Sequence, residues 1–205
     1  MALPNVVKHP ILSDLLAQLR NRETSNFEFS RLLHEVTSLM MFEVTRNMNF
    51  RFASEDVGQS GKRIMNMPSL VVLMRAGNGM IDGARQVLRH APVGHIGIYR
   101  DKLVGCTVEY FFKIPEGSAE NGVILLDPVI GTADSVIASV KRLEQLDVDR
   151  ITVVTILASK RGAARLLEAC PNVELFTLDA SDDLSDEGSL LPGMGDVSAR
   201  MYNYA

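Results

Sequence analysis

The sequence has few of the features that mark secreted or membrane-spanning proteins. Only two cysteines occur in 205 residues, Cys106 and Cys170, and neither stands at metal-type spacing from a second ligand. No apolar run approaches the roughly 20 residues that a membrane span needs. Lys8, His9 and Asp14 interrupt any apolar core that a secretory signal would require. We therefore expect a cytoplasmic protein with reduced thiols and no association with a membrane.

An excess of basic residues is also missing. The 21 Lys+Arg against 25 Asp+Glu leave a formal net charge of -4, which suits neither nucleic acid nor an anionic membrane surface. The four histidines form neither an H-x-x-x-H nor an H-E-x-x-H spacing, so no zinc hydrolase motif is present. What the chain does have is 46% hydrophobic residues, enough to bury one substantial core. We expect a single domain that binds no nucleic acid.

Apolar periodicity predicts helices and strands in alternation along most of the chain. Two helices are expected first, at 13–22 and 26–46, the second with an N-cap at Ser25 or Asn26. An irregular stretch at 47–68 predicts a loop or short hairpin. Further strands are expected at 70–74, 96–99, 103–114, 123–126, 151–157 and 173–178, and further helices at 80–90, from 136 onward and at 161–169. This order favours an α/β fold with a mainly parallel twisted sheet flanked by helices, followed by an acidic, glycine-rich loop.

Two of the predicted strand ends carry residues of chemical interest. Arg75 follows the strand at 70–74, and Asp127 follows the strand at 123–126. After Asp127 a run of small residues leads into a helix, whose first N–H groups are available to bind an anion. No Gly-Lys-Ser/Thr follows and no G-x-G-x-x-G occurs at this turn, so it is neither a P-loop nor a dinucleotide fingerprint. A carboxylate beside a phosphate cradle suits a sugar phosphate, and a purely structural turn is the alternative.

Five segments resemble, in order and spacing, the uracil phosphoribosyltransferase family. They are Lys8-His9-Pro10, the Arg-Ala-Gly-x-Gly-Met turn from Arg75 to Met80, Tyr99-Arg100 with the later Tyr110-Phe111-Phe112-Lys113, the loop from Asp127 to Ser135, and the Leu-Pro-Gly-Met-Gly-Asp run from Leu191 to Asp196. The resemblance extends from about residue 6 to the C-terminus. It implies a phosphoribosyltransferase-like fold with a helical arm at about 6–46, a core at about 68–180, a hairpin flap and a C-terminal base-binding loop at about 181–205.

The resemblance also implies a reaction. The family transfers the phosphoribosyl group of phosphoribosyl pyrophosphate to N1 of uracil, which gives UMP and pyrophosphate in pyrimidine salvage. Mg²⁺ is the expected cofactor, held mainly by substrate oxygens and water, as is usual for this hard ion. The expected partners are therefore phosphoribosyl pyrophosphate and uracil, together with further copies of the chain in a homodimer or higher homo-oligomer.

Roles for individual residues follow from the same resemblance. Arg75 and Arg100 would bind the pyrophosphate, where negative charge builds as it departs. Asp127 would hold the ribose hydroxyls, and Asp196 would lie near the pyrophosphate and its metal. The expected catalytic residues are Arg100, Asp127 and Asp196. The expected phosphoribosyl pyrophosphate-binding residues are Arg75, Arg100, Asp127, Pro128, Val129, Ile130, Gly131, Thr132, Ala133, Asp134, Ser135 and Asp196. The expected uracil-binding residues, which would read the base mainly through main-chain groups, are Leu190, Gly195, Asp196 and Val197.

The ligand-facing segments depart from the family pattern. Asp134 stands where the family has glycine, and a carboxylate about 4 Å from a phosphate costs on the order of 1 to 4 kcal/mol, depending on screening. The cost largely vanishes if this side chain points to solvent and caps the following helix. Ser189 replaces a family tyrosine, and the segment at 101–106 also differs. Two alternatives therefore stay open: transfer to a different heterocyclic base, and a non-catalytic homologue that senses a nucleotide.

Overall fold

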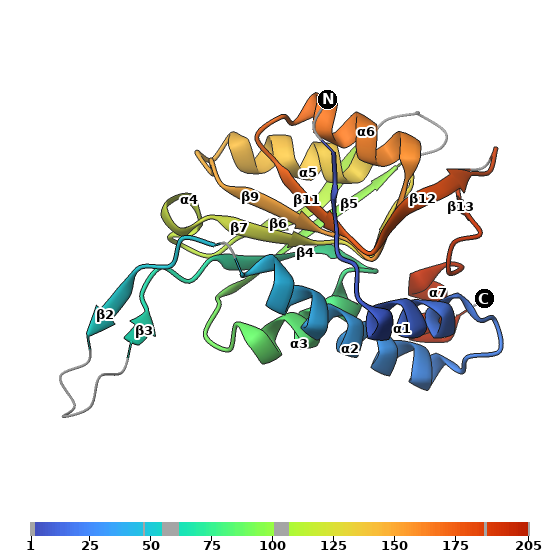
Figure 1. The fold of residues 1–205 in the computed structure, drawn as a ribbon. Helices are drawn as coiled ribbons and strands as arrows, with labels where there is room; N and C mark the ends of the chain where they lie inside the picture. Colours follow the sequence, from blue (N-terminus) through green and yellow to red (C-terminus); the bar gives the residue numbers. More distant parts are fainter. Residues whose placement is uncertain (1–2, 47, 55–61, 101–106, 187, 205) are drawn as a thin grey trace.

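A central β-sheet organises the chain, whose computed structural model describes residues 3–46, 48–54, 62–100, 107–186 and 188–204 (Figure 1). The strands of this sheet are β1 (Asn5–Val6), β4 (Ser69–Met74), β5 (Val93–Arg100), β6 (Thr107–Lys113), β7 (Val123–Leu126), β9 (Ile151–Val154) and β11 (Glu174–Thr177). Their order is β1-β11-β9-β7-β4-β5-β6, and every pair is parallel except β5 and β6. The predicted mainly parallel sheet is confirmed.

Helices cover both faces of this sheet (Figure 1). One face carries α1 (Pro10–Arg20), α2 (Asn26–Val44), α3 (Asn78–Val87) and α7 (Val197–Tyr202). The opposite face carries α5 (Asp134–Glu144) and α6 (Lys160–Ala169), and a single turn, α4 (Ser118–Asn121), precedes β7. No helix of the described residues is long and apolar enough to cross a membrane.

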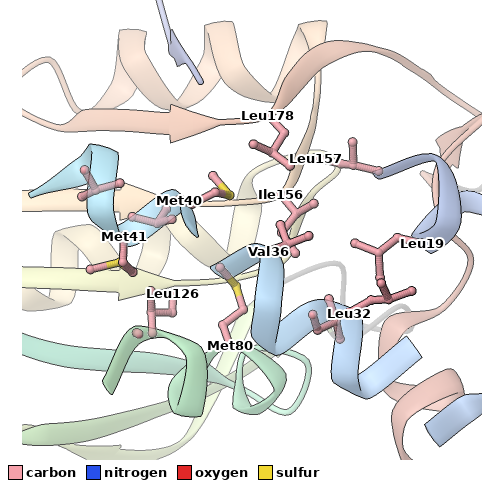
Figure 2. Packing of buried hydrophobic residues seen from close by; sticks show 14 of the residues in the cluster. Leu19, Leu32, Val36, Met40, Met41, Met80, Leu126, Ile156, Leu157 and Leu178 are labelled. Carbon is pink, nitrogen blue, oxygen red and sulfur yellow. The ribbon is translucent and has the colours of Figure 1, made fainter. Parts of the chain in front are cut away.

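The sequence of β4 shows how one strand supplies two cores. Leu70 and Val72 pack among α1, α2 and α3, whereas Val71 and Leu73 pack on the side of α5 and α6. Successive side chains of a strand point to opposite faces, so a continuous apolar run fills both layers. Figure 2 shows the first layer, where Leu126 of β7 lies among the labelled methionines and leucines of the helices. This packing fixes where the carboxyl ends of β4 and β7 lie.

A second sheet lies beside these strand ends. It consists of β8 (Val129–Ile130), β10 (Leu157–Ser159), β12 (Asp179–Leu184) and β13 (Leu190–Leu191), in the order β13-β12-β10-β8. Two predictions are wrong here. The expected strand at 151–157 is two strands in different sheets, because the backbone N–H groups of Ile156 and Leu157 donate to the carbonyl of Pro128 instead of continuing β9. The expected loop at 181–205 contains β13, α7 and most of β12, because the antiparallel pairing of β12 with β13 gives its polar residues backbone partners.

The N-terminal helices confirm one predicted boundary and correct another. The first helix begins at Pro10 rather than at residue 13, because His9 serves as its N-cap through Nδ1, which accepts from the N–H of Ile11 at 3.2 Å. The second begins at Asn26, as predicted, with Ser25 as its N-cap, which was one of the two candidates. The stretch at 47–68 contains the antiparallel hairpin of β2 (Phe52–Ser54) and β3 (Lys62–Ile64), which projects from the body (Figure 1). The segment at 101–106 lies outside the described residues.

Candidate active site

A cavity of about 440 Å³ opens where the carboxyl ends of β4 and β7 meet the second sheet. Two segments form most of its wall: residues 127–135, here called the phosphate loop, and residues 188–198, here called the C-terminal loop. The cavity thus brings together residues that the sequence predicted to share a site. Its lining includes Asp127, Val129, Ile130, Gly131, Thr132, Ala133, Asp134, Ser135, Leu190, Gly195, Asp196 and Val197. Open parallel sheets bind their ligands at this edge.

Two of the predicted residues, Pro128 and Arg75, do not line this cavity. The carbonyl of Pro128 is occupied in backbone hydrogen bonds to β10, so this residue supports the loop rather than facing the cavity. Arg75 lies beside the cavity, with its guanidinium carbon 4.9 Å from the ring centroid of Tyr204. Tyr202 donates from its hydroxyl to the carbonyl of Arg75 at 3.4 Å. Arg100 ends β5, where its backbone pairs with that of β6, and its side chain is outside the described part of the chain.

Asp127 lies at the edge of the cavity, and the pKa of its carboxyl group is raised. Its carboxylate is partly buried and accepts a hydrogen bond from the backbone N–H of Val129. Burial raises the pKa of Asp127 to about 7, and the hydrogen bond from Val129 only partly opposes this effect. A carboxyl group with a pKa near neutrality at a strand end in a cavity is a candidate functional group. It can hold hydroxyl groups when ionised and gives up that capacity when protonated.

The backbone of the phosphate loop is fastened to the start of α6. The hydroxyl of Ser159 donates to the carbonyl of Gly131 at 2.7 Å and accepts from the N–H of Gly162 at 2.7 Å. A Cβ added at Gly162 would lie 2.1 Å from the oxygen of Gly131, so only glycine permits this approach. Ala133, just before α5, has a positive φ of 66°. These contacts hold the loop in the tight turn that exposes the first N–H groups of α5 to the cavity.

Asp134 is paired with a cation. Its Oδ1 lies 2.5 Å from Nη1 of Arg165, and its Oδ2 accepts from the hydroxyl of Thr132 at 2.8 Å. The same Nη1 of Arg165 donates to the carbonyl of Thr132 at 2.7 Å. Of the two outcomes left open for Asp134, capping of the following helix does not occur, because the N-cap position belongs to Ala133 and no side chain caps it. The ion pair, rather than a cap, is what offsets the charge of Asp134.

The C-terminal loop is anchored by Arg200. Its guanidinium donates to four carbonyl oxygens, those of Leu19, Asn21, Thr24 and Met194, at 2.6 to 3.1 Å. It also lies over the ring of Phe29, 3.9 Å from the centroid. Burial lowers the pKa of the Arg200 guanidinium. In the same loop, Asp196 caps α7 through Oδ1, which accepts from the N–H of Ala199 at 2.9 Å. The loop therefore has a fixed shape set by helices at the other end of the chain.

The chain is similar to known proteins over almost its whole length. The model of the uracil phosphoribosyltransferase family matches residues 6–204. The chain belongs to the uracil phosphoribosyltransferase family. A uracil phosphoribosyltransferase of Legionella pneumophila is 37% identical over 204 residues, with 96% of this chain and 94% of that protein covered. One of an Acidovorax species is 38% identical over 206 residues, with 98% and 99% covered.

Solved structures agree with this membership at the level of the fold. A protein structure from Aquifex aeolicus matches with a TM-score of 0.88 at 24% sequence identity and covers 98% of both chains. A hypoxanthine-guanine phosphoribosyltransferase from Bacillus anthracis matches with a TM-score of 0.50 at 9% identity and covers 76% of this chain and 81% of that one. These two likenesses show the phosphoribosyltransferase fold, and membership in the uracil phosphoribosyltransferase family makes the chain an enzyme.

The donor set of the cavity suits Mg²⁺ only with help from a substrate. Asp127 and Asp196 line the same cavity, and carboxylate oxygens are ligands that Mg²⁺ accepts. Among the residues that the structure describes, no group of three or more His, Cys, Asp or Glu side chains is placed to hold a metal ion. An ion bound here would take most of its ligands from substrate and water.

The site residues were predicted from the resemblance to the uracil phosphoribosyltransferase family. Three further residues that contact the site from elsewhere in the fold were not predicted. Ser159, Arg165 and Arg200 support the site, and no role was predicted for any of them. Ser159 is the N-cap of α6, which its position before a helix indicates. Nothing local in the sequence marks the other two, because their partners in the phosphate loop and the helical arm are distant along the chain.

Proposed function

We propose that the protein transfers the phosphoribosyl group of phosphoribosyl pyrophosphate to N1 of uracil and releases UMP and pyrophosphate. The observation that carries this proposal is the single cavity that joins Asp127 and the phosphate loop to Leu190, Gly195 and Val197. The phosphate loop offers a site for a sugar phosphate and the C-terminal loop offers a site for a base, and the transfer of a phosphoribosyl group to a base needs these two sites next to each other. The relatives that bear the uracil phosphoribosyltransferase name, at 36 to 38% identity, support uracil as the base.

The phosphate loop would hold the 5′-phosphate and the ribose. The first N–H groups of α5 and the hydroxyl of Ser135 are donors suited to phosphate oxygens. Asp127 would accept hydrogen bonds from ribose hydroxyls, for which it must be ionised. Because the pKa of Asp127 is raised to about 7, we expect substrate binding to release a proton near neutral pH.

The leaving pyrophosphate gains negative charge in the transition state, so cations placed beside it accelerate the reaction. Arg75 and Arg100 are the residues that we assign to this role, since a guanidinium can bind two phosphate oxygens at once. Asp127 and Asp196 would contribute oxygen ligands to Mg²⁺, which supplies further positive charge to the pyrophosphate when it is bound. The reaction needs no protein nucleophile.

Uracil would be read mainly by main-chain groups of the C-terminal loop, whose shape Arg200 holds. Ser189 also lines the cavity, and it favours a second candidate function, transfer to another heterocyclic base. The non-catalytic alternative was motivated by Asp134, and its pairing with Arg165 removes that motive. We further propose that the protein acts in the cytoplasm in pyrimidine salvage and assembles as a homodimer or higher homo-oligomer.

The test is release of pyrophosphate from phosphoribosyl pyrophosphate in the presence of Mg²⁺ and a panel of pyrimidines, azoles and purines. We expect release that depends on uracil and is abolished by Asp127→Asn and by Arg100→Ala. Asp149→Asn, a change of the same kind at an exposed carboxylate far from the cavity, is the matched control. Faster turnover with another base would contradict uracil as the substrate. UMP binding in calorimetry without turnover of any base would support the sensing homologue instead.

A further inference from the structure

The ion pair between Arg165 and Asp134 at the phosphate loop has no role that the family resemblance implies. Arg165 belongs to α6, yet its guanidinium reaches across to the turn before α5. One nitrogen contacts both the carboxylate of Asp134 and the carbonyl of Thr132, and the hydroxyl of Thr132 closes the set by donating to the same carboxylate. Three groups from two helices and a loop therefore constrain one another.

This arrangement determines the distribution of charge at the phosphate loop. Without a partner, the carboxylate of Asp134 would repel the phosphate of a substrate bound in the same cavity. Arg165 cancels that charge, although its side chain is 48% exposed and the side chain of Asp134 is 19% exposed. An exposed ion pair alone stabilises a fold only weakly. The contribution expected here is to ligand binding, because the dianionic ligand adds a third charge to the same place.

The contact with Thr132 also orients a donor. In a trans peptide the N–H and the C=O point in opposite directions. With the carbonyl of Thr132 directed at Arg165, the N–H of Ala133 faces away from Arg165, and Ala133 itself lines the cavity. Arg165 thus acts on both the charge and the backbone orientation of the cradle from outside the cavity.

We propose that Arg165 is a positioning residue for the 5′-phosphate site, which neutralises Asp134 and fixes the peptide between Thr132 and Ala133. The proposal rests on the proposed function in that the ligand is taken to be a phosphoribosyl donor. It makes Asp134 and Arg165 a unit: an aspartate at this loop position is tolerated because an arginine on α6 reaches it. The effect of losing the arginine must therefore depend on the aspartate.

A four-protein cycle tests this dependence: the natural chain, Arg165→Met, Asp134→Gly and the double variant. We expect Arg165→Met to raise KM for phosphoribosyl pyrophosphate about tenfold, the factor that corresponds to about 1.4 kcal/mol, with KM for uracil and kcat changed less than about twofold. In the Asp134→Gly background the same substitution is expected to change KM by less than about twofold. Asp134→Gly alone is expected to change it by less than about threefold.

Two further variants separate positioning from a general structural effect. Arg165→Lys keeps the charge but lacks the planar fork, so it is expected to recover part of the affinity that Arg165→Met loses. Arg161→Met alters an exposed arginine one turn earlier on α6, outside the cavity lining, and is expected to leave KM unchanged. Thermal melting of each variant checks that it is folded.

The outcomes are separable. An equal loss of affinity in both backgrounds would mean that Arg165 acts independently of Asp134, and no loss in either would mean that the ion pair is of no consequence. Each overturns the proposal. Calorimetric titration of phosphoribosyl pyrophosphate into the four proteins measures the same cycle without turnover. If the protein binds phosphoribosyl pyrophosphate but transfers it to no base, the proposed function is refuted. The calorimetric cycle then still tests whether Arg165 supports binding of this donor.

Discussion

The raised pKa of Asp127 predicts a conflict between stability and substrate binding. The change to examine is Asp127→Asn, which keeps the size of the side chain and an oxygen that can accept from the N–H of Val129. It removes the ionisation and replaces the second oxygen by an NH2 group. We expect this variant to lose binding of phosphoribosyl pyrophosphate, because an amide cannot supply the charge that the ribose hydroxyls and the metal require. We also expect it to be more stable than the natural protein at alkaline pH.

The sign and size of the contribution of Asp127 to the free energy of unfolding follow from the linkage between proton binding and folding. The folded pKa of Asp127 is about 7, whereas the ordinary pKa of an exposed Asp carboxyl is 3.8, so between these two pH values the folded chain binds more protons than the unfolded chain. Stability is therefore lost as the pH rises through this window, and the loss is complete above about pH 7. Between pH 5 and pH 8 the loss amounts to roughly 1 to 3 kcal/mol, where the lower figure allows for the partial solvent exposure of the group.

Urea unfolding of both proteins at pH 5 and pH 8 measures this contribution. Every other titrating group is common to the two chains, so the difference between them isolates residue 127. We expect the free energy of unfolding of the asparagine variant, relative to the natural protein, to rise by about 1 to 3 kcal/mol from the lower to the higher pH. If the difference in the free energy of unfolding between the two proteins is the same at both pH values, the pKa of Asp127 in the folded chain is not near 7, and the reasoning is refuted.

Three other substitutions probe the supports of the site and the core. Arg200→Met leaves carbonyl oxygens of the helical arm and the C-terminal loop without their donor, so we expect a loss of about 2 to 4 kcal/mol in urea unfolding and a higher KM for uracil. Gly162→Ala places a Cβ against the carbonyl of Gly131. We expect it to lower the melting temperature and raise KM for phosphoribosyl pyrophosphate, although alanine favours a helix by about 1 kcal/mol; a stabilised variant with unchanged KM would contradict the close approach. Leu126→Ala, deep in the core of Figure 2, is expected to cost about 2 to 5 kcal/mol in urea unfolding, and a cost below about 1 kcal/mol would contradict its burial.

The central sheet was predictable because its signal is local and strong. Three adjacent strands at its centre, β4, β7 and β9, are short and mostly apolar runs, and apolar side chains on both faces are what a parallel strand under two layers of helices requires. The phosphate loop was predictable for the same reason, since it follows one strand and precedes a helix, although its short strand β8 was not predicted. Its function as a cradle depends on backbone geometry that this local order already implies.

The second sheet was not predictable in the same way. Its strands are between two and six residues long, and polar residues such as Asp179 and Asp183 occupy much of β12. They are strands because they pair with segments distant in sequence, as Leu157 does with Val129 and Asp179. In the segment at 151–157 the chain leaves one sheet for the other at Thr155, but Thr152 lies within β9 and threonine is common in strands, so the division into two strands has no clear local signal.

Asp134 shows why a substitution at a binding site has to be judged with its partners in space. From the sequence it predicts repulsion of the phosphate, because only its position in the loop is visible. In the folded chain α6 packs beside the loop, and Arg165 meets the carboxylate from outside the cavity. The pair carries no net charge, so the electrostatic cost inferred from the aspartate alone is largely absent before any ligand binds. A site degraded by Asp134 would gain greatly in affinity on reversion to glycine, whereas a site built around the pair has little to gain, and in that variant Arg165 no longer has the carboxylate that holds it against Thr132.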